Sequence, residues 1–153
     1  MTLLFLDIDG VLNAWPVRDS DSQLPPVIAK IHPRCVVALN RIWAAVDPSP
    51  KIVIISSWRF VVLNGHMDAH AFGYMLRTHG VCGEVLDVTP DGMSRAEEIR
   101  AWLKQYREAH SIERYVVIDD DHVEIEPFIL CNASTGLTFA DADRVIEILK
   151  GNP

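Results

Sequence analysis

The chain has 153 residues, of which 49% are hydrophobic and 23% charged, with a formal net charge of −7. This composition is typical of a soluble globular protein and excludes a fibrous or disordered chain, and the length predicts a single domain over residues 1–153. The excess of acidic residues argues against broad electrostatic binding to nucleic acid, although it leaves room for a local basic groove.

The first predicted element is a strand over residues 3–6. Its apolar run lacks polar alternation, which is typical of a parallel strand buried on both faces. Residues 13–32 contain two adjacent prolines and four charged residues, and their apolar residues show no clear period. We expect an irregular loop or a minimal flap there. A helix is predicted from Pro33 to about Val46, because apolar residues recur at helical spacing, and the prolines of residues 47–50 end it.

The middle of the chain again predicts strands followed by helices. Residues 52–55 form a second apolar run and predict a second buried strand. A helix is expected over residues 68–79, followed by Gly80 as a terminator. The clearest helix begins with a capping box formed by Ser94 and Glu97 and continues into an apolar stripe.

The C-terminal part supplies a third strong apolar run, residues 115–118, and a weaker one, residues 128–131, which predicts an edge strand. A last helix is expected over residues 140–150. Strands that alternate with helices require crossover connections. The sequence therefore predicts an α/β fold, a Rossmann-like three-layer sandwich with a mainly parallel central sheet.

Cysteine usage and hydropathy indicate the compartment. Cys35, Cys82 and Cys131 are widely spaced and odd in number, which favours reduced thiols in a cytoplasmic protein over a disulfide framework or a zinc site. The apolar N-terminus is interrupted at Asp7, and no stretch approaches the roughly 20 apolar residues that a membrane span needs. We therefore expect no membrane partner.

Polar residues suited to one reaction follow each strong apolar run. Asp7 and Asp9 follow the first, Ser56 and Ser57 the second, and the acidic residues 119–121 the third. The carboxyl ends of neighbouring parallel strands lie close together, and ligands bind at that edge of the sheet. Clustered carboxylates repel one another unless a cation is present, and Mg²⁺ is the usual cation beside phosphate.

At these positions the sequence resembles a known family, the haloacid dehalogenase-like (HAD) phosphohydrolases. Residues 7–12, Asp-Ile-Asp-Gly-Val-Leu, resemble the first motif of that family, and Ser56 resembles the second. Arg95 stands where the third motif usually has lysine, and the pair Asp119-Asp120 resembles the fourth. The four motifs occur in the family's order, and they imply a HAD-like fold and phosphoryl-transfer chemistry.

Within this superfamily the chain most resembles the small capless HAD domains associated with nucleic-acid repair. The stretches that carry this looser resemblance are residues 56–59, 89–103 and 136–138. It implies that no substantial cap domain covers the site. An open site suits a nucleotide, a nucleic-acid end or another phosphomonoester as the phosphorylated substrate.

The resemblance also implies catalytic roles and metal ligands. Asp7 would attack phosphorus and become an aspartyl-phosphate, and Asp9 would act as general acid and then as general base. Mg²⁺ would be bound by the Asp7 carboxylate, the Asp9 backbone carbonyl and Asp120, with Asp119 as a direct or water-mediated ligand.

The phosphate-binding residues implied are Ser56, Arg95 and Gly10, where glycine lets the chain approach the site closely. Ser57 is an alternative to Ser56, which also suits a purely structural role as the cap of the following turn. Arg59 is the alternative to Arg95, although Arg95 has the physical advantage of sitting at a helix start, where the dipole and free N–H groups already favour an anion.

Two further readings remain open from the sequence. The protein could be a HAD-fold phosphotransferase, or a non-catalytic phosphate-binding module that retains the acidic residues. Trp15 and Trp58 closely follow two of the motifs and suit either stacking on a base or sugar or packing beneath a loop.

Overall fold

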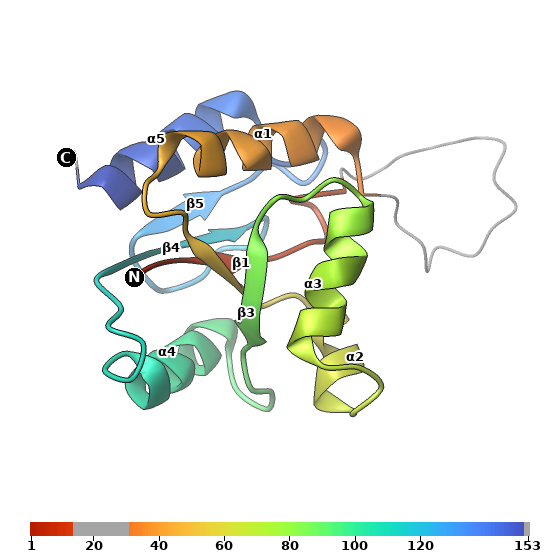
Figure 1. The fold of residues 1–153 in the computed structure, drawn as a ribbon, viewed down its shortest axis with the longest axis vertical. Coiled ribbons are helices and arrows are strands. Elements are labelled where there is room, and N and C mark those ends of the chain that lie inside the picture. Colours follow the sequence, from red (N-terminus) through yellow and green to blue (C-terminus); the bar gives the residue numbers. More distant parts are fainter. Residues whose placement is uncertain (14–30, 152–153) are drawn as a thin grey trace, which may run out of the picture.

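The computed structural model describes residues 1–13 and 31–151, and the strands in these ranges form one parallel sheet in the order β3-β2-β1-β4-β5 (Figure 1). The strands are β1 (Thr2–Leu6), β2 (Lys51–Ile54), β3 (Glu84–Val88), β4 (Arg114–Asp119) and β5 (Phe128–Leu130). The helices are α1 (Pro33–Ala45), the 3-10 turn η1 (Ser57–Arg59), α2 (Phe60–Leu63), α3 (Ala69–Thr78), α4 (Arg95–Tyr106) and α5 (Phe139–Lys150).

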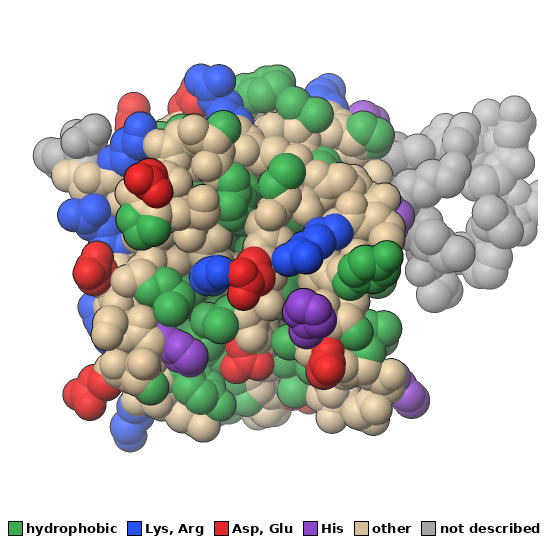
Figure 2. Space-filling model, viewed as in Figure 1, with side chains coloured by type: hydrophobic (Ala, Val, Ile, Leu, Met, Phe, Trp, Pro, Cys, Tyr) green, Lys and Arg blue, Asp and Glu red, His purple; other side chains and the backbone are tan. Residues whose placement is uncertain are grey.

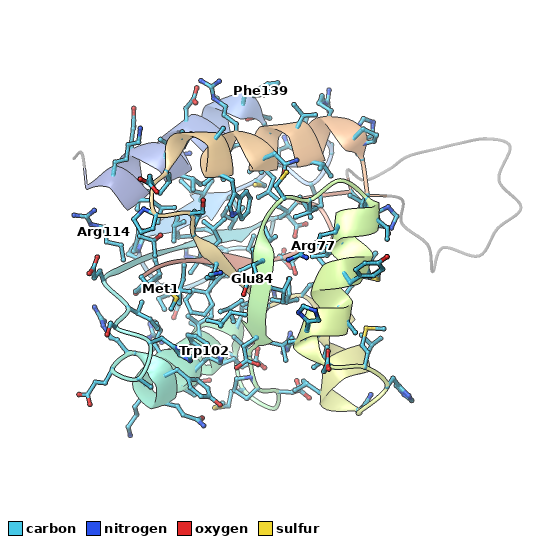
Figure 3. All side chains as sticks on the ribbon, viewed as in Figure 1. Met1, Arg77, Glu84, Trp102, Arg114 and Phe139 are labelled. Atoms are coloured by element: carbon cyan, nitrogen blue, oxygen red, sulfur yellow. The ribbon has the colours of Figure 1, made fainter. Side chains whose placement is uncertain are left out.

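Helices cover both faces of the sheet, because its strands present apolar side chains in both directions. Leu4 and Leu6 pack into one buried cluster with α1, α3 and α5, whereas Leu3 and Phe5 pack into a second cluster with α4. Figure 1 shows α1 and α5 on one side of the sheet and α4 on the other. Trp102 of α4 lies against the sheet (Figure 3) and meets Phe5 edge-to-face, with ring centroids 5.6 Å apart.

These layers confirm the predicted α/β Rossmann-like sandwich with a parallel sheet. The three strong apolar runs are β1, β2 and β4, the weaker run is the edge strand β5, and the four long helices lie within one or two residues of their predicted bounds. Strand β3 and the short segments η1 and α2 were not predicted. The structure also shows the capping box, since the Glu97 carboxylate accepts hydrogen bonds from both the N–H and the hydroxyl of Ser94.

The described ranges contain no extra folded module that would act as a cap, in agreement with the expected capless architecture. The predicted flap over residues 13–32 lies outside the described residues except at its two ends, and Trp15 lies outside them entirely.

No helix in the described part of the chain is long and apolar enough to cross a membrane. On the face seen in Figure 2, basic and acidic side chains are interspersed.

The topology brings the ends of β1 and β4 together. The two strands are neighbours in register, with Leu6 opposite Ile118, while the connections that leave them run toward opposite edges of the sheet. The pairing continues one residue beyond β1, since the Asp7 N–H donates to the Ile118 carbonyl at 3.0 Å. Such a switch point is where open α/β sheets bind ligands.

Candidate active site

Three carboxylates converge where β1 and β4 end. One carboxylate oxygen from each of Asp7, Asp119 and Asp120 lies within 4.8 Å of the other two. Asp7 and Asp119 are only 5% and 2% exposed, and Asp120 is half-buried. The sheet register explains the convergence, because Asp7 directly follows β1 and Asp119 is the last residue of β4.

The electrostatics of this cluster favour a bound cation. Burial and the neighbouring Asp119 raise the pKa of Asp7 to about 7, and although Arg95 acts in the opposite direction it does not outweigh them. Burial also raises the pKa of Asp119 and, together with repulsion from Asp121, that of Asp120. Buried carboxylate oxygens held this close suit a hard divalent ion such as Mg²⁺, and these three side chains are the ones placed to bind it.

Arg95 reaches this cluster from the start of α4. Its Nη1 atom donates to Asp7 Oδ1 at 3.1 Å and to Asp119 Oδ2 at 2.8 Å. The capping box fixes the first turn of the helix, which places the guanidinium over the edge of the sheet. The side chain is 31% exposed, so its position is open to a ligand as well as to the two carboxylates.

Arg59, the competing arginine, is placed differently. It is 4% exposed and pairs with buried Glu98 of α4 at 2.8 Å. Its Nη1 atom also donates to the backbone carbonyls of Ile55 and Ser56. Arg59 therefore anchors the loop after β2 to α4, and the structure brings Arg95 rather than Arg59 into contact with the acids.

Asp9 is outside the three-carboxylate group and has its own partners. The indole N–H of Trp58 donates to Oδ1 and Oδ2 of Asp9 at 3.1 and 3.0 Å. The side-chain amide of Asn13 donates to Oδ1 at 2.8 Å. The same Asn13 side chain accepts the Gly10 N–H at 2.9 Å, which ties the turn after β1 together.

The two serines after β2 differ in exposure. Ser56 is fully buried, and its hydroxyl accepts the Trp58 N–H at 3.4 Å as the cap of η1, so the structural role considered from the sequence is present. Ser57 is exposed. The two serines are the first and second residues after Ile55, whose N–H donates to the Leu6 carbonyl at 3.1 Å, so both belong to the edge that carries the aspartates.

Gly10 makes the turn after β1 possible. Its φ is +73°, and a Cβ atom at this position would lie 2.2 Å from Asp120 Oδ2. Any side chain would therefore displace one of the three clustered carboxylates.

We expect Gly10→Ala to weaken Mg²⁺ binding by at least about tenfold, because Asp120 must move to make room. Gly65→Ala is the matched control, since Gly65 has nearly the same φ of +74° but nothing within 4 Å of the added Cβ. It carries only the backbone cost of a positive φ, about 1 kcal/mol. Isothermal titration of both variants with Mg²⁺ measures the difference, and equal affinities would show that the contact with Asp120 is unimportant.

Mg²⁺ is also expected to stabilise the fold, and more so at about pH 8 than at about pH 5. Because the pKa of Asp7 rises from 3.8 to about 7 on folding, the associated stability is fully present below about pH 4 and is lost as pH rises through 7. Above that pH the ionised cluster repels itself until a cation binds. At 100 times its Kd, Mg²⁺ contributes about 2.7 kcal/mol, or about 5 to 10 °C in Tm.

Thermal denaturation with and without Mg²⁺ at the two pH values measures this effect. Sodium chloride of equal ionic strength is the control for general screening. Asp120→Asn, which removes one carboxylate of the cluster, should reduce the rise in Tm. An equal rise with sodium chloride, or a larger Mg²⁺ effect at the lower pH, would contradict a metal site at this cluster.

The contacts of Asn13 and Trp58 with Asp9 were not predicted; from the sequence Trp58 was considered only for stacking on a base or sugar or for packing beneath a loop. Asn13 follows the first motif directly, and its position four residues after Asp9 was an available but weak signal for a contact. Trp58 lies 49 residues from Asp9 along the chain, so no local pattern could reveal the hydrogen bond between them.

Comparison with known proteins gives one family. A family model described as "HAD domain in Swiss Army Knife RNA repair proteins" matches residues 3–142. Searches of the curated proteins and of the solved structures gave no match. The matched range includes every strand, apart from the first residue of β1, and every site residue described above.

Proposed function

The chain belongs to the HAD domains of Swiss Army Knife RNA repair proteins, and from this premise we propose that it is a Mg²⁺-dependent phosphatase that hydrolyses a phosphomonoester through an aspartyl-phosphate at Asp7. Membership of this family supports hydrolase or phosphotransferase chemistry in RNA repair. The observation that carries the finer proposal is the convergence of Asp7, Asp119 and Asp120 beside Arg95.

In the first step, a carboxylate oxygen of Asp7 attacks phosphorus and forms the new P–O bond. The bond from phosphorus to the leaving oxygen breaks, and its electron pair stays on that oxygen. Asp9 donates a proton to the leaving oxygen, which departs as an alcohol. A metal ion held by Asp7, Asp119, Asp120 and the Asp9 carbonyl would offset the repulsion between the nucleophile and the phosphate.

In the second step, Asp9, now a carboxylate, removes a proton from a water molecule that attacks the phosphorus of the aspartyl-phosphate. The bond between phosphorus and the Asp7 oxygen breaks, and its electron pair returns to Asp7. Inorganic phosphate leaves, and both aspartates regain their starting protonation states.

Arg95 is proposed to bind the phosphate. It contacts the two carboxylates through Nη1 alone, which leaves the other N–H groups of the guanidinium as donors. Ser56 and Gly10 would complete the phosphate site through the Ser56 hydroxyl, nearby backbone N–H groups and the close approach that Gly10 permits. Ser57, the exposed neighbour, is the alternative hydroxyl.

The substrate we propose is a phosphorylated RNA end, with a nucleotide as the smaller alternative. The family's description supports RNA, and the lack of a cap module in the described residues leaves the site accessible to a large substrate. The net charge of −7 argues for contacts limited to the phosphorylated end rather than a long track of phosphates.

The three cysteines are unpaired, which supports a reducing, cytoplasmic compartment.

The test is release of inorganic phosphate from an aryl phosphate and from 3′- and 5′-phosphorylated RNA, a mononucleotide and a sugar phosphate, each with and without Mg²⁺. Mg²⁺-dependent release, fastest from an RNA end, is expected. Transfer of the phosphoryl group to an added alcohol in preference to water would favour a phosphotransferase. Phosphate binding without any turnover would favour a non-catalytic module and would overturn the proposal.

A further inference from the structure

The indole N–H of Trp58 contacts the side chain of Asp9, the residue proposed as general acid and base. It donates to both oxygens of Asp9, and the ring is half-buried against the apolar cluster that includes α1 and α3. An indole N–H can only donate, and a partly buried one requires an acceptor. The acceptor that the Trp58 N–H contacts is the carboxylate that we assign to proton transfer.

Trp58 is itself firmly held. Its backbone N–H bonds to the Ser56 hydroxyl, and the next residue, Arg59, is locked by its buried ion pair with Glu98 and by two backbone carbonyls. The indole therefore projects from a turn that is held by Ser56 on one side and by Arg59 on the other. A group on such a support can fix the orientation of another side chain.

The two oxygens of Asp9 are not equivalent. Oδ1 accepts hydrogen bonds from the Asn13 amide at 2.8 Å and from Trp58 at 3.1 Å, whereas Oδ2 accepts only from Trp58 at 3.0 Å among the described residues. Two donors occupy the lone pairs of Oδ1, so Oδ2 is the oxygen with room for a proton. The contacts thus select both one rotamer of Asp9 and one of its oxygens.

We propose that Trp58 is a positioning residue that holds Asp9 so that Oδ2 delivers the proton to the leaving oxygen. This inference rests on the proposed phosphatase function. The proton moves from Oδ2 to the leaving oxygen as the bond between that oxygen and phosphorus breaks, and Trp58 keeps its own proton throughout. Because a poor leaving group needs this proton most, loss of the indole N–H should be felt most by substrates with poor leaving groups.

The experiment compares Trp58→Phe with the unmodified protein on a series of aryl and alkyl phosphates at saturating Mg²⁺, using kcat/KM. We expect a loss of about tenfold for alkyl phosphates and less than about threefold for p-nitrophenyl phosphate, since the indole N–H stabilises the negative charge that forms on Asp9 as its proton leaves, and such a hydrogen bond is worth about one order of magnitude. A plot of log(kcat/KM) against the pKa of the leaving alcohol should therefore become steeper.

Trp43→Phe is the matched control. The Trp43 indole N–H is also half-buried and also has one acceptor, the Pro50 carbonyl at 2.9 Å, but it lies where β2 begins, at the end of the sheet opposite the aspartates. This variant should leave the slope unchanged. If Trp58→Phe fails to fold, a tryptophan analogue with sulfur in place of the indole N–H, incorporated at position 58, keeps the ring shape and should give the same steeper slope.

The outcomes separate the two levels of the proposal. Equal losses across the series, or no loss at all, would overturn the role of Trp58 while leaving the phosphatase function in place. Absence of Mg²⁺-dependent turnover of every member of the series by the unmodified protein would overturn the proposed function, and this inference with it.

Discussion

Asp7→Asn is expected to lower Mg²⁺-dependent phosphatase activity by at least about 1,000-fold, because the amide is a poor nucleophile and a poor metal ligand. The fold should survive the change. Burial first, and then the negative charge of Asp119, raise the pKa of Asp7 to about 7, so a neutral side chain of the same shape removes both the cost of burying a charge and the repulsion in the metal-free protein. We therefore expect the Tm of the variant at about pH 8 without Mg²⁺ to equal or exceed that of the parent protein.

Asp121→Asn serves as the control for this substitution. Asp121 is the next acidic residue after the cluster, is exposed, and contacts Asp119 through its backbone N–H rather than its side chain. The activity of the Asp121→Asn variant should stay within about threefold of the parent value, because substitutions of exposed residues usually have small effects. If Asp7→Asn retained most of the activity, or if both substitutions lowered it equally, the assignment of Asp7 as nucleophile would be wrong.

The second large effect concerns stability. Glu98→Ala is expected to lower the free energy of unfolding by about 3 to 5 kcal/mol, because it removes the buried counter-charge of Arg59 and leaves only the exposed Asp91, 3.6 Å away. The side chains of Glu98 and Arg59 are 3% and 4% exposed and 2.8 Å apart. Burial already lowers the pKa of Arg59, and the charge of Glu98 is the main effect that opposes this. Urea denaturation of the variant measures the loss.

Glu97 provides the comparison one residue earlier. It is exposed and belongs to the capping box, so Glu97→Ala should cost about 1 kcal/mol or less. The double variant Arg59→Met, Glu98→Leu should recover much of the stability that Glu98→Ala loses, since it leaves no unpaired charge in the buried site. A cost below about 1 kcal/mol for Glu98→Ala would show that Arg59 finds another counter-charge or reaches water.

The parts of the fold that the sequence predicts are those with a strong local pattern. The runs of residues 3–6, 52–55 and 115–118 are apolar because they are buried on both faces, with Tyr115 alone half-buried, and such runs are recognisable without any partner. Strand β3 escaped prediction because Glu84 and Asp87 interrupt its apolar residues, as an edge position permits. The turns η1 and α2 have three and four residues, too few to show a helical period.

The same distinction applies to the site. Asp7, Asp9 and the pair Asp119-Asp120 stand out because each lies at the end of a recognisable strand or within three residues after it, and a parallel sheet brings such ends together. The choice between Arg59 and Arg95 could not be made from the sequence, since it depends on a buried partner, Glu98, that is 39 residues from Arg59. Only the folded arrangement shows which guanidinium contacts the carboxylates.

The central claim, covalent catalysis by Asp7, is tested most directly by trapping the phosphorylated protein. The chain is mixed with a ³²P-labelled phosphomonoester and Mg²⁺, quenched in acid within a single turnover, and reduced with borohydride, which converts an aspartyl-phosphate into homoserine. We predict label on the protein, homoserine at position 7, and no label on Asp7→Asn. Label on any other residue, or turnover by Asp7→Asn at the rate of the parent protein, would contradict this account.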